Sequence, residues 1–138
     1  MTLSSQSKVC KVLMVDDETL FLELMETILA DLKLEVVRAS NAKEAIELVE
    51  AHSPDLIITD TNMPLGSGID LIRSVRERNN LTPIIIFFDG SHFDPQLKPG
   101  DILNMGANAI LTKLDMFKSL KIHTKNLLKL NRKATSSE

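Results

Sequence analysis

Short apolar runs alternate with longer amphipathic stretches along this chain. The apolar runs, each predicted to be a strand, are residues 11–15, 35–38, 55–59, 84–88 and 109–111. Between them, apolar residues recur every three or four positions, which is the period of a helix with one buried face. Strands that alternate with helices at these lengths are typical of a parallel sheet covered on both faces. The pattern therefore predicts an α/β fold with a right-handed, doubly wound sheet.

Local signals mark where the helices begin. Asn41 is followed three residues later by Glu44, and Ser67 is followed at the same spacing by Asp70. This spacing is typical of a capped helix N-terminus. Further helices are predicted after the first strand, around residues 101–105, and from near Asp115 into the C-terminal tail. The first of these is predicted to bury two lines of apolar residues: Leu20, Leu24 and Ile28, and Phe21, Met25, Leu29 and Leu32.

Four charged residues follow predicted strands directly. Asp16 and Asp17 follow the first strand, Asp60 the third and Lys113 closely follows the fifth. Ligands of open parallel sheets bind beyond the carboxyl ends of the strands, so these side chains are expected to meet at one edge. Each aspartate alone is also explained as an ordinary turn or cap residue. The combination of all four in one α/β chain favours a functional site.

Three crowded carboxylates favour a hard cation, because they otherwise repel one another. Mg²⁺ suits such a site, since it binds one or two carboxylates and keeps positions for water or a phosphoryl oxygen. A carboxylate is also a competent nucleophile toward phosphorus, so Asp60 is a candidate to form an aspartyl phosphate. Lys113 would then act as a point cation for the transferred phosphoryl group.

At this point the chain resembles the receiver domain of response regulators, especially the CheY-like, single-domain type, over about residues 8–130. The segments that carry the resemblance are VLMVDDE, LIITDTNMP, TPIII and GANAILTK. The resemblance implies a flavodoxin-like, five-stranded sheet of order 2-1-3-4-5 with helices on both faces. It also implies a sensor histidine kinase or a histidine phosphotransfer protein as partner, and an unknown downstream protein target.

The resemblance assigns a role to each site residue. Asp60 is the expected phosphoacceptor and Lys113 its expected phosphoryl contact. The expected Mg²⁺ ligands are Asp17 and Asp60 through their side chains, Asn62 through its backbone carbonyl, and Asp16 mainly through a metal-bound water.

Three positions depart from the family pattern. Phe88 stands where a Ser or Thr usually donates a hydroxyl to the phosphoryl group, and Ile110 stands where an aromatic residue usually rotates inward. Leu114 replaces the proline that usually follows the lysine. A slipped register would let Ser91 supply the hydroxyl instead. Asp89 is predicted to weaken or shorten phosphorylation by adding negative charge near the phosphoryl group.

Composition and charge fit this interpretation. The chain of 138 residues suits one domain, with a disordered lead at 1–8, the receiver domain at 9–130 and a flexible tail at 131–138. No signal peptide or membrane span is apparent, so a cytoplasmic location is expected. The net charge is −3, and basic residues gather toward the C-terminus. A solvated helix face, whose last-turn cations favour the negative end of the helix dipole, is preferred there over a partner or nucleic-acid patch. Tyr and Trp are absent, so nothing supports stacking on bases.

The leading functional hypothesis is a receiver that accepts phosphoryl from a partner's phosphohistidine and signals by protein contact or onward phosphotransfer. It would not be a turnover enzyme. A second hypothesis is a docking or scaffold module in which Phe88 and Ile110 uncouple the site from conformational change. A third is a phosphatase of the haloacid-dehalogenase type, which expects a second aspartate where this chain has Asn62.

Overall fold

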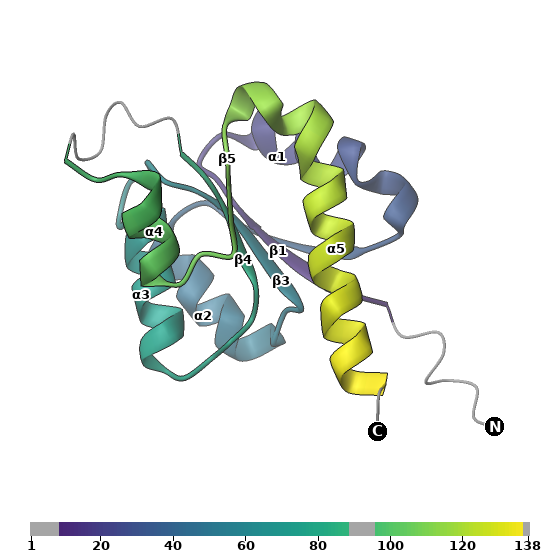
Figure 1. Cartoon of the computed structure of the whole chain (residues 1–138). Coiled ribbons are helices and arrows are strands. Elements are labelled where there is room, and N and C mark those ends of the chain that lie inside the picture. The colour runs from purple at the N-terminus through teal and green to yellow at the C-terminus, as the bar shows by residue number, and fades with distance from the viewer. Residues whose placement is uncertain (1–8, 89–95, 137–138) are drawn as a thin grey trace.

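The fold is a parallel sheet whose strand order matches the prediction. The computed structural model describes residues 9–88 and 96–136, with side chains as far as residue 129. Its strands are β1 (Lys11–Val15), β2 (Glu35–Ala39), β3 (Leu56–Asp60), β4 (Ile84–Phe87) and β5 (Ala109–Leu111). They form one five-stranded sheet of order β2-β1-β3-β4-β5 (Figure 1). The order reverses between β1 and β3, which is where doubly wound sheets bind their ligands.

Helices cover both faces of the sheet. They are α1 (Thr19–Ile28), η2 (Ala30–Leu32), α2 (Ala42–His52), α3 (Gly68–Glu77), α4 (Pro99–Met105), η3 (Lys113–Asp115) and α5 (Met116–Ser136). One apolar core joins strand residues such as Met14 to Met25 of α1 and Leu120 of α5. A second core joins the other face, including Leu13, to the side covered by α2, α3 and α4 (Figure 1). Strands buried on both faces explain why their sequences are continuously apolar.

The predicted helix caps are confirmed. The Asn41 side chain accepts a hydrogen bond from the Glu44 N–H at 2.8 Å. Ser67 and Asp70 form a reciprocal capping box, with the Ser67 N–H donating to Asp70 Oδ2 at 2.9 Å. Both helices therefore begin where their sequences predicted, which fixes how the chain enters α3 directly after β3 and its loop.

The structure differs from the sequence prediction in some details. Leu20 was predicted to lie on a buried stripe of α1, but it is 79% exposed, since the helix buries Phe21, Leu22 and Met25 instead. Helix α5 continues to Ser136, into the segment predicted as a flexible tail. The predicted lead at residues 1–8 lies outside the described residues.

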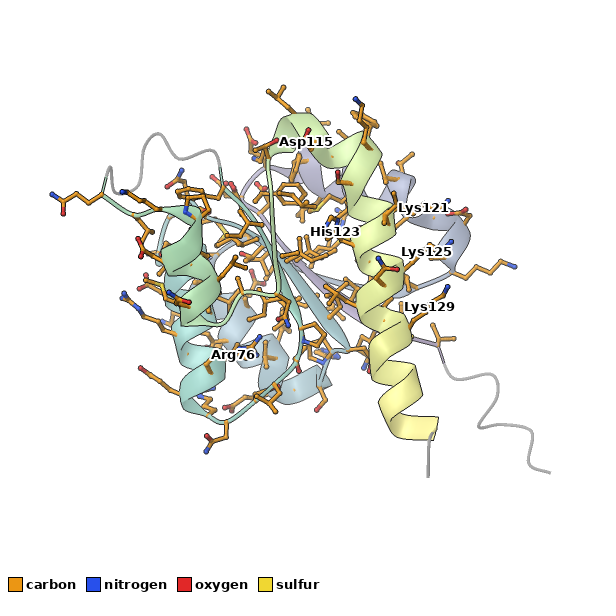
Figure 2. The ribbon with its side chains drawn as sticks, viewed as in Figure 1. Arg76, Asp115, Lys121, His123, Lys125 and Lys129 are labelled. Atoms are coloured by element: carbon orange, nitrogen blue, oxygen red, sulfur yellow. The ribbon has the colours of Figure 1, made fainter. Side chains whose placement is uncertain are left out.

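The basic residues of α5 as far as Lys129 lie at the surface of the helix. Figure 2 shows Lys121, Lys125 and Lys129 along this helix, and Lys121 pairs with Asp31 of η2. Lys125 and Lys129 are exposed to solvent. Within residues 9–88 and 96–136, none of the helices is long and apolar enough to cross a membrane.

Candidate functional site

Asp60 is the last residue of β3, and the chain beyond it turns tightly into α3. The Gly68 N–H, at the first turn of α3, donates to the Thr61 carbonyl at 2.9 Å. A Cβ atom built on Gly68 would lie 2.1 Å from the Asp60 carbonyl oxygen. Gly66, just before, has a φ of +100°, in the region that favours glycine. The turn therefore requires glycine at position 68 to bring α3 against the end of β3.

Asp16 is the buried acid of the site. Its side chain is 1% exposed, and its Oδ1 accepts a hydrogen bond from the Glu18 N–H at 2.9 Å. Among the residues that the structure describes, none forms a hydrogen bond with its Oδ2. Burial raises the Asp16 pKa to about 6, and repulsion from Asp60 acts in the same direction. An ionised carboxylate with one unsatisfied oxygen leaves room for a cation or a cation-bound water.

The three predicted acids meet at the carboxyl edge of the sheet. One carboxylate oxygen from each of Asp16, Asp17 and Asp60 lies within 4.8 Å of the others. Asp16 is buried, Asp60 is half-buried and Asp17 is exposed, so the group opens to solvent on one side. Oxygen ligands at this spacing are suited to a hard divalent cation.

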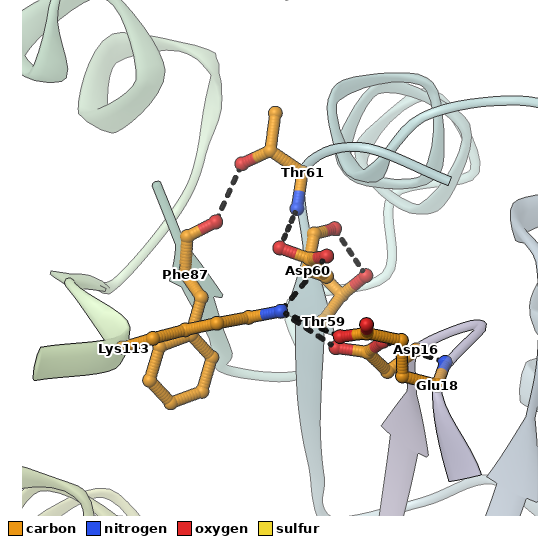
Figure 3. Close-up of polar contacts among 7 residues, drawn as sticks. All are labelled: Asp16, Glu18, Thr59, Asp60, Thr61, Phe87 and Lys113. Carbon is orange, nitrogen blue, oxygen red and sulfur yellow. Dashed lines mark hydrogen bonds and ion pairs between the residues drawn. The ribbon is translucent and has the colours of Figure 1, made fainter. Parts of the chain in front are cut away.

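Lys113 reaches this group from the end of β5. Its ammonium Nζ lies 3.4 Å from Asp60 Oδ2, 3.5 Å from Asp16 Oδ2 and 3.6 Å from Glu18 Oε1 (Figure 3). Burial acts to lower the Lys113 pKa, but attraction by Asp60 and Asp16 outweighs it and raises the pKa. The same ammonium lies 4.2 Å from the centre of the Phe21 ring, a favourable cation–π distance.

Asp60 has opposing influences on its charge. Burial raises its pKa most, while Lys113 and a hydrogen bond from the Thr61 N–H to Oδ1, at 2.9 Å, act to lower it. The net shift is upward. The N–H and the ammonium hold the two carboxylate oxygens separately, so the orientation of the carboxylate is fixed (Figure 3).

Asp17, Asp60 and Lys113 line an open pocket of about 470 Å³. Its lining residues are Asp17, Glu18, Asp60, Asn62, Phe87, Phe88, Thr112, Lys113 and Leu114. Asn62 is therefore at the pocket, but the roles predicted for it and for the other site residues stay predictions.

The sequence did not identify Glu18, Phe21 or Gly68 as residues of the functional site. The position of Glu18 directly after the acidic pair was an available signal. The ring of Phe21 packs edge-on against Phe87, with centroids 5.3 Å apart, and nothing in the sequence indicated its contact with Lys113.

Two of the three positions that the sequence marks as departures from the family pattern, Phe88 and Leu114, line this pocket. Phe88 is 8% exposed and belongs to the core on the α2, α3 and α4 side, and its N–H donates to the Leu111 carbonyl at 2.8 Å. Ile110 is half-buried against the same core, whereas Leu114 is 94% exposed. The hydroxyl of Thr61 donates to the Phe87 carbonyl at 2.6 Å. The predictions about Asp89 and Ser91 lie outside the described residues.

Comparisons with known proteins agree on one family. The family model of the response regulator receiver domain matches residues 12–124. The response regulator protein PilR of Pseudomonas aeruginosa is 38% identical over 103 residues, which are 75% of this chain and 22% of that protein. The transcriptional regulatory protein PhoP of Bacillus subtilis is 32% identical over 104 residues, covering 75% of this chain and 42% of that protein. The chain thus spans less than half of the length of these curated relatives.

Solved structures show the same similarity. The receiver domain of a putative Luxo repressor protein from Vibrio parahaemolyticus superposes with a TM-score of 0.85 at 25% identity, covering 95% of this chain and 98% of that one. The chemotaxis response regulator CheY4 of Vibrio cholerae gives a TM-score of 0.74 at 27% identity, covering 87% and 99%.

Proposed function

The chain belongs to the family of response regulator receiver domains, and we propose that it is a signalling domain that accepts a phosphoryl group on Asp60. The donor would be the phosphohistidine of a sensor kinase or of a phosphotransfer protein. The proposal sets aside the phosphatase hypothesis, since a different family model matches residues 12–124. A cytoplasmic location remains a prediction.

The observation that carries the proposal is the pairing of Asp60 with Lys113 at the open edge of the sheet. Asp60 Oδ2 lies 3.4 Å from the ammonium, and the carboxylate faces a pocket rather than the core. In the transfer, a carboxylate oxygen of Asp60 forms a bond to phosphorus and the phosphorus–nitrogen bond of the phosphohistidine breaks. The imidazole leaves with the electron pair and takes up a proton. Lys113 then neutralises charge on the phosphoryl oxygens.

The donor set suits Mg²⁺. Asp17 and Asp60 would bind it through carboxylates and Asn62 through its backbone carbonyl, while the unsatisfied Oδ2 of Asp16 would accept from a metal-bound water. A bound divalent ion would neutralise the acids and the incoming phosphoryl oxygens. The chain's own residues hold Asp60 in place, because the Thr61 N–H and Lys113 contact one carboxylate oxygen each.

A second candidate function is a receiver-like docking module in which the site no longer drives a conformational change. The observation that favours it is the buried phenyl ring of Phe88, which has no hydroxyl and is part of the core. Moving this residue toward a phosphoryl group would remove a large apolar side chain from its packing. Binding to a partner would then be independent of phosphorylation.

Intact mass after incubation with Mg²⁺ and acetyl phosphate tests the proposal. A single phosphoryl adduct is expected on the wild type and is expected to be absent from Asp60→Asn and from a metal-free control. Asp55→Asn and Asp101→Asn are less suitable controls, because each carboxylate accepts a hydrogen bond from a backbone N–H, that of Lys11 at 2.8 Å and that of Lys98 at 3.0 Å. Glu77→Gln is the matched carboxylate variant, because Glu77 is exposed on α3 and is not among the residues that line the pocket. Absence of the adduct at short sampling times would favour the docking module.

A further inference from the structure

Glu18 contributes a further acid to the pocket. Its carboxylate oxygen lies 3.6 Å from the Lys113 ammonium, and its side chain is 68% exposed. Figure 3 shows Glu18 and Asp16 on the same side of the ammonium, with Asp60 on another. Glu18 also lines the pocket together with Asp17 and Asp60. It is therefore placed both to hold the lysine and to face an incoming phosphodonor.

We propose that Glu18 is a positioning residue that shares Lys113 with the phosphoacceptor and makes the site discriminate against highly charged small phosphodonors. This inference rests on the proposed function and identifies what sets the donor preference of that site. Asp16, Asp17, Glu18 and Asp60 together outweigh the single charge of Lys113. Even a bound divalent ion leaves the pocket net negative, so a dianionic donor is repelled more strongly than a monoanionic donor.

The exposure of Glu18 separates its role from that of Asp16. Asp16 is buried and its Oδ1 is fixed by a backbone N–H, so it belongs to the frame of the site. The Glu18 side chain makes its contact with Lys113 from the solvent side. Glu18 is the N-cap residue of α1, but its side chain makes no capping hydrogen bond. Replacing its carboxylate with an amide leaves its backbone bonds in place, since the Glu18 carbonyl accepts from the Phe21 and Leu22 N–H groups. The substitution therefore removes charge and little structure.

The reaction that reports this effect is phosphorylation by a small donor. With acetyl phosphate, a bond forms between an Asp60 oxygen and phosphorus, the phosphorus–oxygen bond to the acetyl group breaks, and acetate leaves with the electron pair. Phosphoramidate transfers the same group and releases ammonia after the departing nitrogen takes up a proton. Near neutral pH, acetyl phosphate is mainly a dianion and phosphoramidate is mainly a monoanion. Comparing the two therefore tests how the charge of the donor affects transfer to the same acceptor, Asp60.

The experiment compares phosphorylation rate constants of Glu18→Gln and wild type with both donors at saturating Mg²⁺. We expect Glu18→Gln to raise the rate with acetyl phosphate about 3- to 10-fold, and the rate with phosphoramidate by a smaller factor. The gain is expected to shrink in about 1 M salt, where charges are screened within roughly 3 Å. Glu18→Asp retains the charge and is expected to keep the wild-type ratio of the two donors.

Glu23→Gln is the matched control, because Glu23 is exposed on α1, the helix that Glu18 precedes, and is not among the residues that line the pocket. It should leave both rates at wild-type values. Equal gains with both donors, no gain, or a gain that persists in high salt would each overturn the inference. Failure of the proposed function gives a different result, since then neither the wild type nor any variant acquires a phosphoryl group.

Discussion

Two parts of the carboxyl edge of the sheet differ in how closely they follow the family pattern. Three acids lie together at the ends of β1 and β3, and the Lys113 ammonium, from beyond β5, forms ion pairs with two of them, Asp16 and Asp60. Just beyond β4, Phe88 is buried at the position where the resemblance predicts a hydroxyl, and Ile110 packs against the same core. The residues that would carry the chemistry are thus separate from those that would transmit it. A receiver can keep the first set while the second changes.

The largest effect is expected at the retained part of the edge, from Lys113→Gln. Removing the ammonium takes away the cation nearest to Asp60, at 3.4 Å, and leaves the acids less compensated. We expect phosphorylation by acetyl phosphate to slow by about 10²-fold, as is typical when one charged transition-state contact is lost. Rate constants for the formation of the phosphoryl adduct, followed by intact mass, measure this loss.

Lys121→Gln is the control for this prediction, because Lys121 pairs with Asp31 on the outer face of α5. It should phosphorylate at the wild-type rate. If Lys113→Gln also did so, the contact between Lys113 and Asp60 would have no part in phosphoryl transfer, and the site would not follow the family's chemistry.

The altered part of the edge is tested by Phe88→Thr. The variant removes a ring that is 8% exposed, and it places a hydroxyl beside the pocket. We expect a loss of about 3 kcal/mol in the free energy of unfolding, from the cavity and the buried polar group. We also expect phosphorylation to change backbone amide shifts around Ile110 more widely than in the wild type. Urea unfolding and NMR measure the two effects.

Phe88→Leu separates these two effects, since it retains an apolar side chain and supplies no hydroxyl. It should lose less stability than Phe88→Thr and show no wider response to phosphorylation. A wild-type protein that already responds as widely as Phe88→Thr would show that the site transmits its signal without a hydroxyl at this position.

A smaller loss is expected from Gly68→Ala, which disturbs the junction between β3 and α3. The new Cβ would lie 2.1 Å from the Asp60 carbonyl oxygen, so the backbone that carries the phosphoacceptor must shift. We expect about 2 kcal/mol of destabilisation. Gly100→Ala in α4 is the control, because a Cβ there meets no atom of the described residues within 4 Å and alanine favours the helix. Equal stabilities of the two variants in urea would contradict the tight junction.

Most of the fold was predictable because each strand and cap has a local signal. Five apolar runs gave the strands to within about one residue, and Asn41 and Ser67 gave two helix starts. The acids were predictable because parallel strands bring their carboxyl ends to one edge. The exposure of Leu20 was not predictable, because a period of three to four residues does not show which of two adjacent rows of apolar side chains on a helix faces the core.

Contacts between distant segments had no local signal. In the sequence, Arg76 has the character of an exposed helical residue. In the structure, its guanidinium donates hydrogen bonds to the carbonyls of Gly106, Asn80 and Thr82. It therefore ties the end of α3 to the loop between α4 and β5 (Figure 2). The contact of Lys113 with Phe21 is similar, because it depends on how α1 packs beside the end of β5. Such contacts depend on the assembled fold, so sequence periodicity does not predict them.

The smallest predicted effect is a pH dependence that arises from Asp16. Its pKa is about 6 in the fold against 3.8 for the free group, so the folded state binds a proton more tightly than the unfolded state. Stability without divalent cations should therefore fall as pH rises through this window, and the raised pKa of Asp60 acts in the same direction. Between pH 5 and pH 7 we expect Asp16 to cost about 1 kcal/mol of unfolding free energy.

Asp16→Asn tests this assignment, because the amide oxygen can still accept from the Glu18 N–H while the buried charge is removed. In metal-free urea titrations the variant should be more stable than the wild type at pH 7 and should lose much of the pH dependence. Asp31→Asn is the contrasting variant: Lys121 lowers the pKa of that exposed acid, mainly through a side-chain hydrogen bond, so its removal should not flatten the curve between pH 5 and pH 7. An Asp16→Asn curve as steep as that of the wild type would mean that a group other than Asp16 binds the proton, and burial of Asp16 would then not be the cause of the pH dependence.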